Sequence, residues 1–261
     1  MSERGLDTWT PDKVTYAAQN LPDEEITNWV CTCLAQSVLK GQPRLRKQNM
    51  SVERTDMYAP TAYTRSWQDM EACMVARSHT LVLRMEAMLK LARGDALFSR
   101  PKEHLEKLKG KLHRVVGILH YGHNGGGHWV TVVWEFRTNQ LIVFNSFPQW
   151  PMPTETSRNL CKAGNTLCNM WSGQPCMEDR GTGRWKVVQP PRVAVQKGSE
   201  CGCRACLWLW AFSMWPDYFL DQYLNRGKDP MASLVKSPEV IANVLSLVTR
   251  QCLDPPIDAT M

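Results

Sequence analysis

Hydrophobic residues in the first half of the chain recur at helical spacing. In the segment 21–40 the apolar residues share one helical face, and proline and acidic residues occupy its first turn, so a helix is predicted there. Two further helices are predicted around 66–77 and 81–93, the second of them capped by Gly94. The Lys- and Glu-rich stretch 102–112 is predicted to form a short exposed helix. The first half is therefore expected to be mostly helical.

From Arg114 onward the pattern becomes typical of β-strands. The stretches 115–120, 129–136 and 141–144 are rich in β-branched and aromatic residues. The glycines at 125–127 predict a flexible turn between the first two strands, and a short polar turn separates the second from the third. This region therefore predicts a sequential antiparallel meander.

Beyond the meander the chain is expected to return to helices. Residues 154–171 favour a helix, 184–195 an irregular strand pair limited by its prolines, and 238–251 a final helix. The order of helices, meander and helices predicts an α+β fold with a central mixed β-sheet flanked by helices.

The most apolar segment, 203–215, directly follows the turn Gln196–Gly202. If this segment is a helix, Cys201 lies at its N-terminus, where free N–H groups and the helix dipole favour the thiolate. A cysteine with a low pKa suits nucleophilic catalysis. The structural alternative is a buried cysteine that simply opens a core helix.

The composition is that of an ordinary globular protein. Of the 261 residues, 43% are hydrophobic and 21% are charged, which argues against global disorder. The N-terminal segment lacks the apolar region of a signal peptide, and no apolar run approaches the roughly 18–20 residues of a membrane span. We therefore expect a soluble intracellular protein with reduced thiols and no membrane partner. The net charge of +6 suggests a polyanionic partner, although solvated helix faces explain the basic clusters equally well.

The residue types that thiol catalysis requires occur in suitable places. A cysteine nucleophile needs a base, a group that orients the base, and donors for the oxyanion. His128, at the mouth of a predicted strand, is the best candidate base, and His123 is the runner-up. Asn145 ends the neighbouring strand, so antiparallel pairing is expected to bring its amide oxygen to the imidazole N–H of His128. Gln196 and the backbone N–H of Cys201 are the candidate oxyanion donors.

Gly127 and Trp129 flank the candidate base and are the candidate substrate-binding residues. A glycine lets a substrate backbone approach closely because it carries no side chain. Both positions are therefore expected to contact the substrate.

The same residues resemble a known family. The chain looks like adenain, the adenovirus maturation protease, in its catalytic strands, its active-site turn and two downstream motifs. The segments that carry this resemblance are Gly126–Trp129, Val130–Trp134, Phe144–Phe147, Gln196–Gly202, Ala211–Pro216 and Ser237–Val240. The order of His-Trp, acidic residue, Gln and Cys-Gly also defines the wider clan that includes the SUMO-specific proteases. Leu21–Ile26 is similar to the start of the catalytic domain in those enzymes.

The resemblance implies a single cysteine protease domain, 1–261, with the papain-like architecture of the adenain/SUMO-protease type. Its expected parts are a flexible arm (1–20), a helical N-terminal part (21–112), a catalytic core (113–251) and a tail (252–261).

The function implied by the resemblance is that of a cysteine endopeptidase that cleaves viral structural precursors after small residues such as glycine. Its catalytic residues are expected to be Cys201, His128, Asn145 and Gln196, with no metal or other cofactor. One alternative is a protease specific for ubiquitin-like proteins, and a further one is a catalytically weak pseudoprotease that binds a tail without cutting it. A viral enzyme is expected in the host nucleus or the virion, and a cellular one in the nucleus or cytoplasm.

The chain departs from the family pattern at several positions. Asn145 stands where the family has Asp or Glu, and Gln196 lies slightly nearer to the cysteine than usual. Asn20 replaces the tryptophan that lines the diglycine tunnel of SUMO proteases, which counts against SUMO as the substrate. Adenain is activated by DNA and by a disulfide-linked peptide. Cys176 is displaced from the position that such a link needs, whereas DNA as an activator is compatible with the basic charge.

A metal site is the competing interpretation of the cysteines. The cysteines at 201, 203 and 206, with those at 161, 168 and 176 upstream, suggest a zinc site. Their spacing is irregular for a zinc knuckle and no matching pair with histidine follows, so zinc is not favoured.

Overall fold

The computed structural model describes residues 72–75, 79–83, 85–95, 110–123, 126–172, 185–198 and 200–253. The arm 1–20, the helix expected over 21–40, most of the stretch 102–112 and the end of the tail lie outside the described residues.

The strands form one six-stranded sheet in which they follow their order in the sequence. The strands are β1 (Ala72–Val75), β2 (Thr80–Leu83), β3 (Arg114–His123), β4 (Gly126–Glu135), β5 (Gln140–Phe144) and β6 (Lys186–Val188). The β2–β3 and β5–β6 pairs are parallel, and the others are antiparallel. The predicted α+β class with a central mixed sheet is therefore confirmed, as is the meander β3–β4–β5.

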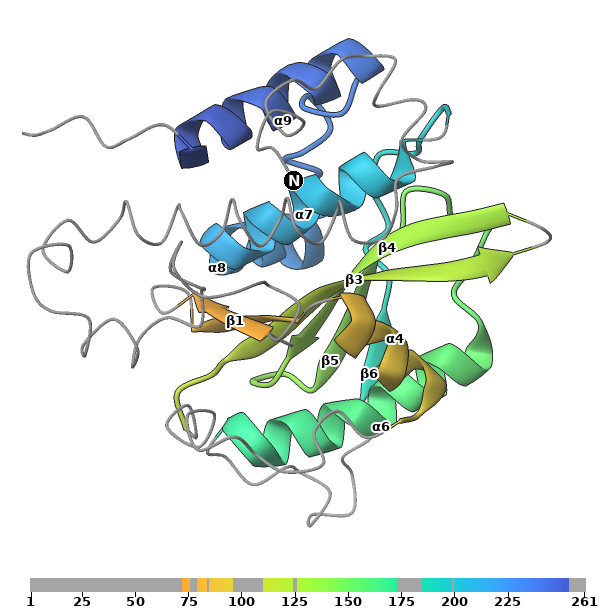
Figure 1. Cartoon of the computed structure of the whole chain (residues 1–261), viewed down its shortest axis with the longest axis vertical. Coiled ribbons are helices and arrows are strands. Elements are labelled where there is room, and N and C mark those ends of the chain that lie inside the picture. The colour runs from red at the N-terminus through yellow and green to blue at the C-terminus, as the bar shows by residue number, and fades with distance from the viewer. Residues whose placement is uncertain are drawn as a thin grey trace, which may run out of the picture.

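Helices cover both faces of this sheet (Figure 1). One face carries α7, α8 and α9, and the other carries α4 and α6. The helices are α4 (Met85–Arg93), α6 (Thr154–Trp171), α7 (Cys201–Met214), α8 (Pro216–Leu220), the π-helical η5 (Asp221–Asn225) and α9 (Pro238–Leu253). In the described ranges no helix combines the length and the apolar character that a membrane crossing requires.

Burial on both faces explains why the central strands are apolar throughout. Side chains alternate between the faces of a strand. In β3, Val116 and Ile118 join the core under α7, whereas Val115 and Leu119 join the core under α4 and α6. A strand enclosed on both sides needs apolar residues at consecutive positions rather than at every second one.

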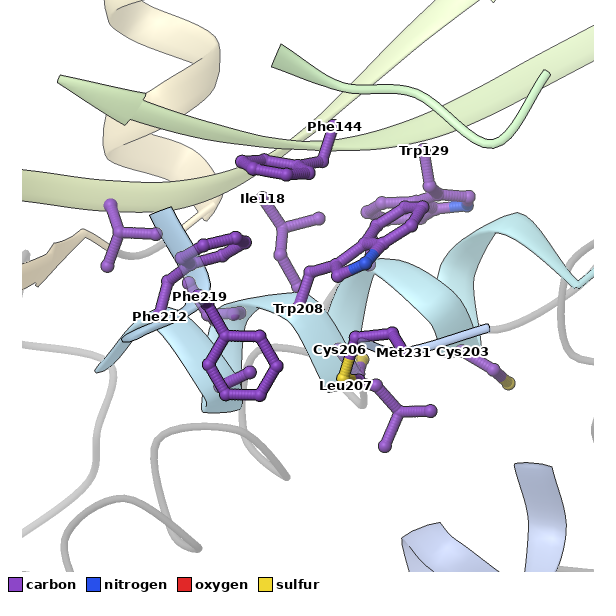
Figure 2. Packing of buried hydrophobic residues seen from close by; sticks show 14 of the residues in the cluster. Ile118, Trp129, Phe144, Cys203, Cys206, Leu207, Trp208, Phe212, Phe219 and Met231 are labelled. Carbon is purple, nitrogen blue, oxygen red and sulfur yellow. The ribbon is translucent and has the colours of Figure 1, made fainter. Parts of the chain in front are cut away.

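The helix α7 is the central helix of one core because it is apolar nearly all round. Its residues Trp208 and Phe212 pack against Phe144 of the sheet, with ring centroids 5.9 and 4.3 Å apart. Figure 2 shows Phe144 and Trp129 pointing from the strands toward this helix. Because α9 covers another side of α7, the whole length of α7 is enclosed.

The expected helices around 66–77 and 81–93 are partly wrong. Ala72–Val75 forms the strand β1, and the second segment begins as the strand β2 before α4 starts at Met85. The residues of β2 are all buried between β1 and β3, and a short apolar run of this kind does not distinguish a strand from a helix. Gly94, with φ of +85°, ends α4 as predicted.

Two other expectations need correction. The segment 184–195 contains one described strand, β6, rather than a strand pair, because Pro190 and Pro191 lack the N–H groups that a ladder needs. Gly126 and Gly127 belong to β4 rather than to a flexible turn, since they pair with the end of β3. The helices predicted at 154–171 and 238–251 are confirmed by α6 and α9.

Candidate active site

His128 and Asn145 meet at one end of the sheet. His128 lies on β4 and is fully buried, and Asn145 directly follows β5. The antiparallel register pairs Thr131 with Phe144, so Asn145 continues past the last paired residue toward His128. The Nε2 atom of His128 and the Oδ1 atom of Asn145 are 2.8 Å apart. The structure thus brings these two predicted residues together.

The orientation of the Asn145 amide is fixed from both sides. The backbone N–H of Phe147 donates to Oδ1 at 2.8 Å, and Nδ2 donates to the carbonyl oxygen of Trp150 at 2.9 Å. Exchanging the amide oxygen and nitrogen would place donor against donor and acceptor against acceptor. Oδ1 therefore faces His128, and Nε2 must carry the hydrogen of the imidazole. The buried Nδ1 atom is then the basic nitrogen of neutral His128.

Aromatic rings enclose His128. Tyr121 is its cross-strand partner on β3, with ring centroids 5.7 Å apart, and the rings of Trp150 and Phe147 lie at 6.0 and 6.3 Å. The Tyr121 hydroxyl donates to the same Trp150 carbonyl that Asn145 uses, at 2.8 Å. These rings exclude water from the histidine and its amide partner, which strengthens the hydrogen bond between them.

Cys201 opens α7, as predicted, but the expected low pKa of its thiol is wrong. Burial raises the pKa of the thiol, and the backbone N–H groups of Trp129, Gly202 and Cys201 itself only partly offset this effect. The nearby charge of Glu200 raises the pKa further. Desolvation thus outweighs the helix N-terminus, because Cys201 is only 4% exposed.

A hydrogen bond between α7 and β4 sets the position of Cys201. The Thr131 hydroxyl donates to the carbonyl oxygen of Ala205 at 2.9 Å. Four residues along a helix advance about 6 Å, and two residues along a strand advance about 6.6 Å. The distance along α7 from Ala205 back to Cys201 is therefore about equal to the distance along β4 from Thr131 back to Trp129. This agrees with the contact between the Trp129 N–H and the sulfur of Cys201.

Tyr121 is linked to both candidate catalytic residues. Burial raises the pKa of the Tyr121 hydroxyl, and the charge of the Cys201 thiolate raises it further. Tyr121 is also the cross-strand partner of His128, so it pairs with the imidazole and feels the charge of Cys201.

Gln196 lies in the turn before α7 and is tied to the end of β5. Its backbone N–H donates to the Ser146 carbonyl at 2.8 Å, and the Ser146 hydroxyl donates to its Oε1 at 2.6 Å. Its Nε2 donates to the Gly198 carbonyl at 2.8 Å. One of the two Nε2 hydrogens is therefore used within the turn, and the other is the one that the predicted oxyanion role requires.

Gly127 and Trp129, the candidate substrate-binding residues, share a neighbour in His120. A Cβ atom on Gly127 would come within 2.1 Å of the Nε2 atom of His120, so any other residue here would require the His120 ring to move. The His120 ring stacks on Trp129 at 4.3 Å, and Trp129 is only 2% exposed. The indole thus belongs to the core under α7, whereas Gly127 is exposed beside the site.

The residues Cys203 and Cys206 are fully buried packing residues of α7 (Figure 2).

Sequence reasoning did not find Tyr121, the Trp150 carbonyl or the pairing of Ser146 with Gln196. A backbone carbonyl leaves no signal in the type of its residue. Tyrosine and serine are common in strands and turns, so Tyr121 and Ser146 did not stand out.

The geometry defines the class of site. A cysteine at a helix N-terminus, a buried histidine on a strand that packs against this helix and an amide fixed on that histidine are the three residue types that a Cys–His–Asn thiol hydrolase uses.

Several solved structures resemble this chain at low sequence identity. No protein-family model and no curated protein matches the chain. Among solved structures, the Chlamydia trachomatis effector ChlaDUB1 is 15% identical with a TM-score of 0.45, covering 94% of this chain and 90% of that one. A second ChlaDub1 structure is 17% identical with a TM-score of 0.39, covering 66% and 76%. A de-sumoylating protease is 12% identical with a TM-score of 0.40, covering 67% and 72%. At these values the interpretation of the site rests on its own geometry.

Proposed function

We propose that this chain is a cysteine protease with Cys201 as nucleophile and His128 as base. The observation that carries the proposal is the Asn145 amide, whose two backbone partners direct its oxygen to Nε2 of His128. This contact holds the tautomer in which Nδ1 can accept a proton. A histidine buried only for packing does not need an orienting group fixed in this way.

The proposed reaction begins with a neutral thiol. Nδ1 of His128 takes the proton of Cys201 as the sulfur attacks the scissile carbonyl carbon, and the resulting imidazolium gives that proton to the leaving amine. The backbone N–H of Cys201 and the amide of Gln196 donate to the tetrahedral oxyanion. Water activated by His128 then hydrolyses the thioester and releases the free cysteine.

For the substrate we propose the C-terminal tails of ubiquitin-like modifiers, with viral structural precursors cut after small residues as the second class. Both classes follow from the sequence resemblance. Among the distant structural matches are a Chlamydia trachomatis effector bound to ubiquitin and the SUMO protease Ulp1, so modifiers are the first substrates to test.

Turnover by the full chain of fluorogenic ubiquitin and SUMO substrates, and of peptides with glycine before the scissile bond, tests the proposal. Cys201→Ala and His128→Ala are each expected to abolish turnover, because they remove the nucleophile and the base. Cys161→Ala, on α6, is the matched control and should keep wild-type activity. Full activity of Cys201→Ala on any cleaved substrate would exclude this mechanism.

The second candidate is a non-catalytic module that binds a tail, and the burial of Cys201 with its raised thiol pKa favours it. Iodoacetamide labelling separates the two functions. A catalytic Cys201 should lose reactivity in His128→Ala because the base is gone. Equal labelling rates in both proteins, together with binding of a modifier without cleavage, would favour the binding module.

A further inference from the structure

The turn that carries Gln196 and leads into Cys201 is held by charged side chains at Ala194. The backbone N–H of Ala194 donates to Oδ2 of Asp229 at 2.6 Å, and its carbonyl accepts from Nη1 of Arg204 at 2.8 Å. The backbone N–H and the carbonyl of Ala194 are thus each bound by a charged side chain, one by a carboxylate and the other by a guanidinium. The position of the chain two residues before Gln196 is fixed accordingly.

Arg204 is the central residue of this arrangement. It lies in the first turn of α7, and its side chain is 2% exposed. Its Nε and Nη2 atoms contact Oε2 of Glu200 at 3.0 and 2.8 Å, and Nη2 also donates to the Val235 carbonyl at 2.9 Å. The guanidinium therefore joins the turn before the nucleophile, the residue next to the nucleophile and the segment before α9.

Asp229 connects the same turn to the core. It accepts the Tyr223 hydroxyl and, at 2.9 Å, the backbone N–H of Met231. The Tyr223 hydroxyl in turn accepts from the Trp208 indole at 3.2 Å. Trp208 is buried on α7. The hydrogen bonds through Asp229 and Tyr223 therefore connect Ala194 to the same helix that carries Cys201.

We propose that Arg204 and Glu200 are positioning residues of the active site, which hold the nucleophile turn and set the charge beside the thiol. The proposal rests on the proposed function and extends it to residues that do not touch the substrate. A structural salt bridge elsewhere on α7 would stabilise the fold equally well. Arg204 instead binds Ala194, which precedes Gln196, and Glu200, which lies between Gln196 and Cys201 and directly precedes the nucleophile.

The charges around Cys201 determine the sign of the expected effects. The charged and titratable groups near Cys201 are Glu200, directly ahead of the helix, and Tyr121 on β3, and His128 on β4 is its proposed base. Arg204 acts through its ion pair with Glu200. The Glu200 charge raises the pKa of the thiol, and the guanidinium opposes that charge. Removing the carboxylate charge should therefore favour the thiolate, and removing the guanidinium should disfavour it.

The test measures the pH profile of Cys201 labelling by iodoacetamide, site by site with mass spectrometry, together with kcat and KM on a cleaved substrate. In Glu200→Gln the labelling midpoint should fall by at least about half a pH unit, and in Arg204→Met it should rise by a similar amount. Arg204→Met should lower kcat by about 10- to 100-fold with little change in KM, because the nucleophile turn is displaced. Arg204→Lys keeps the positive charge but loses the several fixed donors of the guanidinium group. It should therefore recover the wild-type labelling midpoint but only part of kcat.

Arg226→Met, which removes an exposed ion pair with Asp221, is the matched control and should behave as wild type. If Arg204→Met fails to fold, Glu200→Gln and Arg204→Lys decide the outcome. A wild-type midpoint and kcat in both of these variants would overturn the proposal. The labelling profiles need no substrate, so they test this inference even if Cys201→Ala shows that the proposed protease function is wrong.

Discussion

At the scale of single residues, the surroundings of Asn145 are built for an amide. Its Nδ2 donates to a carbonyl and its Oδ1 accepts from a backbone N–H, so both ends have complementary partners. A carboxylate at this position would place an oxygen against the Trp150 carbonyl, where a donor is needed. The departure from the acidic residue of the proteases that the sequence resembles thus has a local structural reason.

Asn145→Asp is therefore expected to lower both stability and turnover. Loss of the buried donor should cost about 1–3 kcal/mol of unfolding free energy, and the displaced side chain should reduce kcat. Asn159→Asp is the matched control, because the amide of Asn159 also donates to a carbonyl, that of Ala92, away from the site. It should lower stability without lowering kcat. Denaturant unfolding and steady-state kinetics measure both effects, and an Asn145→Asp variant with wild-type stability and higher kcat would contradict this account.

The raised pKa of Cys201 gives a pH prediction at the same scale. Since burial disfavours the thiolate, the thiolate fraction should increase as the pH rises toward the folded-state pKa, above the ordinary value for cysteine. The iodoacetamide labelling rate of Cys201 should accordingly keep increasing from about pH 7 to about pH 10. A rate that is constant from about pH 6 upward would indicate a preformed thiolate–imidazolium pair instead.

At the scale of elements, close packing of α6 against the segment before β6 supports the sheet. Gly164 of α6 lies under the Trp185 ring, where an added Cβ atom would come within 2.6 Å of the indole. The Trp185 indole donates to Asn165 of the same helix at 2.6 Å. The helix and the segment therefore pack this closely because residue 164 has no side chain.

Gly164→Ala should consequently lower the unfolding free energy by about 1–3 kcal/mol, because the indole must move from its packed position. Gly198→Ala is the control for stability, since a Cβ atom at Gly198 meets no atom within 4 Å. Thermal unfolding of both variants tests this expectation. Equal melting temperatures for the two proteins would show that Trp185 adapts without cost.

At the scale of the whole molecule, an ionic cluster around the buried pair Arg114 and Glu135 joins the sheet to α8. Arg114 at the start of β3 is 0% exposed and contacts Glu135 at 2.8 Å and Asp217 at 2.6 Å. Burial alone would raise the pKa of Asp217, but the hydrogen bond from Arg137 and the charges of both arginines hold it below its usual value. The cluster thus links the start of β3, the end of β4 and the helix that follows α7.

Arg114→Met is expected to destabilise the fold by about 3 kcal/mol, because it leaves the buried Glu135 carboxylate with a weaker set of partners. Arg226→Met, at an exposed pair, should leave the unfolding free energy unchanged. Chemical denaturation of both variants provides the measurement. A wild-type midpoint for Arg114→Met would mean that Arg137 alone compensates the carboxylate.

Features that depend on neighbouring residues could be predicted from local sequence patterns. The strands from Arg114 to Phe144, the start of α7 at Cys201 and the approach of Asn145 to His128 all follow from local patterns and from pairing between consecutive strands. A meander brings together residues that are close in sequence, so its contacts can be inferred without knowing the rest of the fold.

Features that depend on distant partners could not be predicted and were set by the folded chain. It made Thr80–Leu83 a strand by enclosing it between β1 and β3, and it fixed the Asn145 amide through the Trp150 carbonyl. It also kept the Cys201 thiol out of water and placed Arg204 across the turn and the segment before α9. Burial and backbone acceptors set these properties, and neither is encoded in the type of the residue concerned.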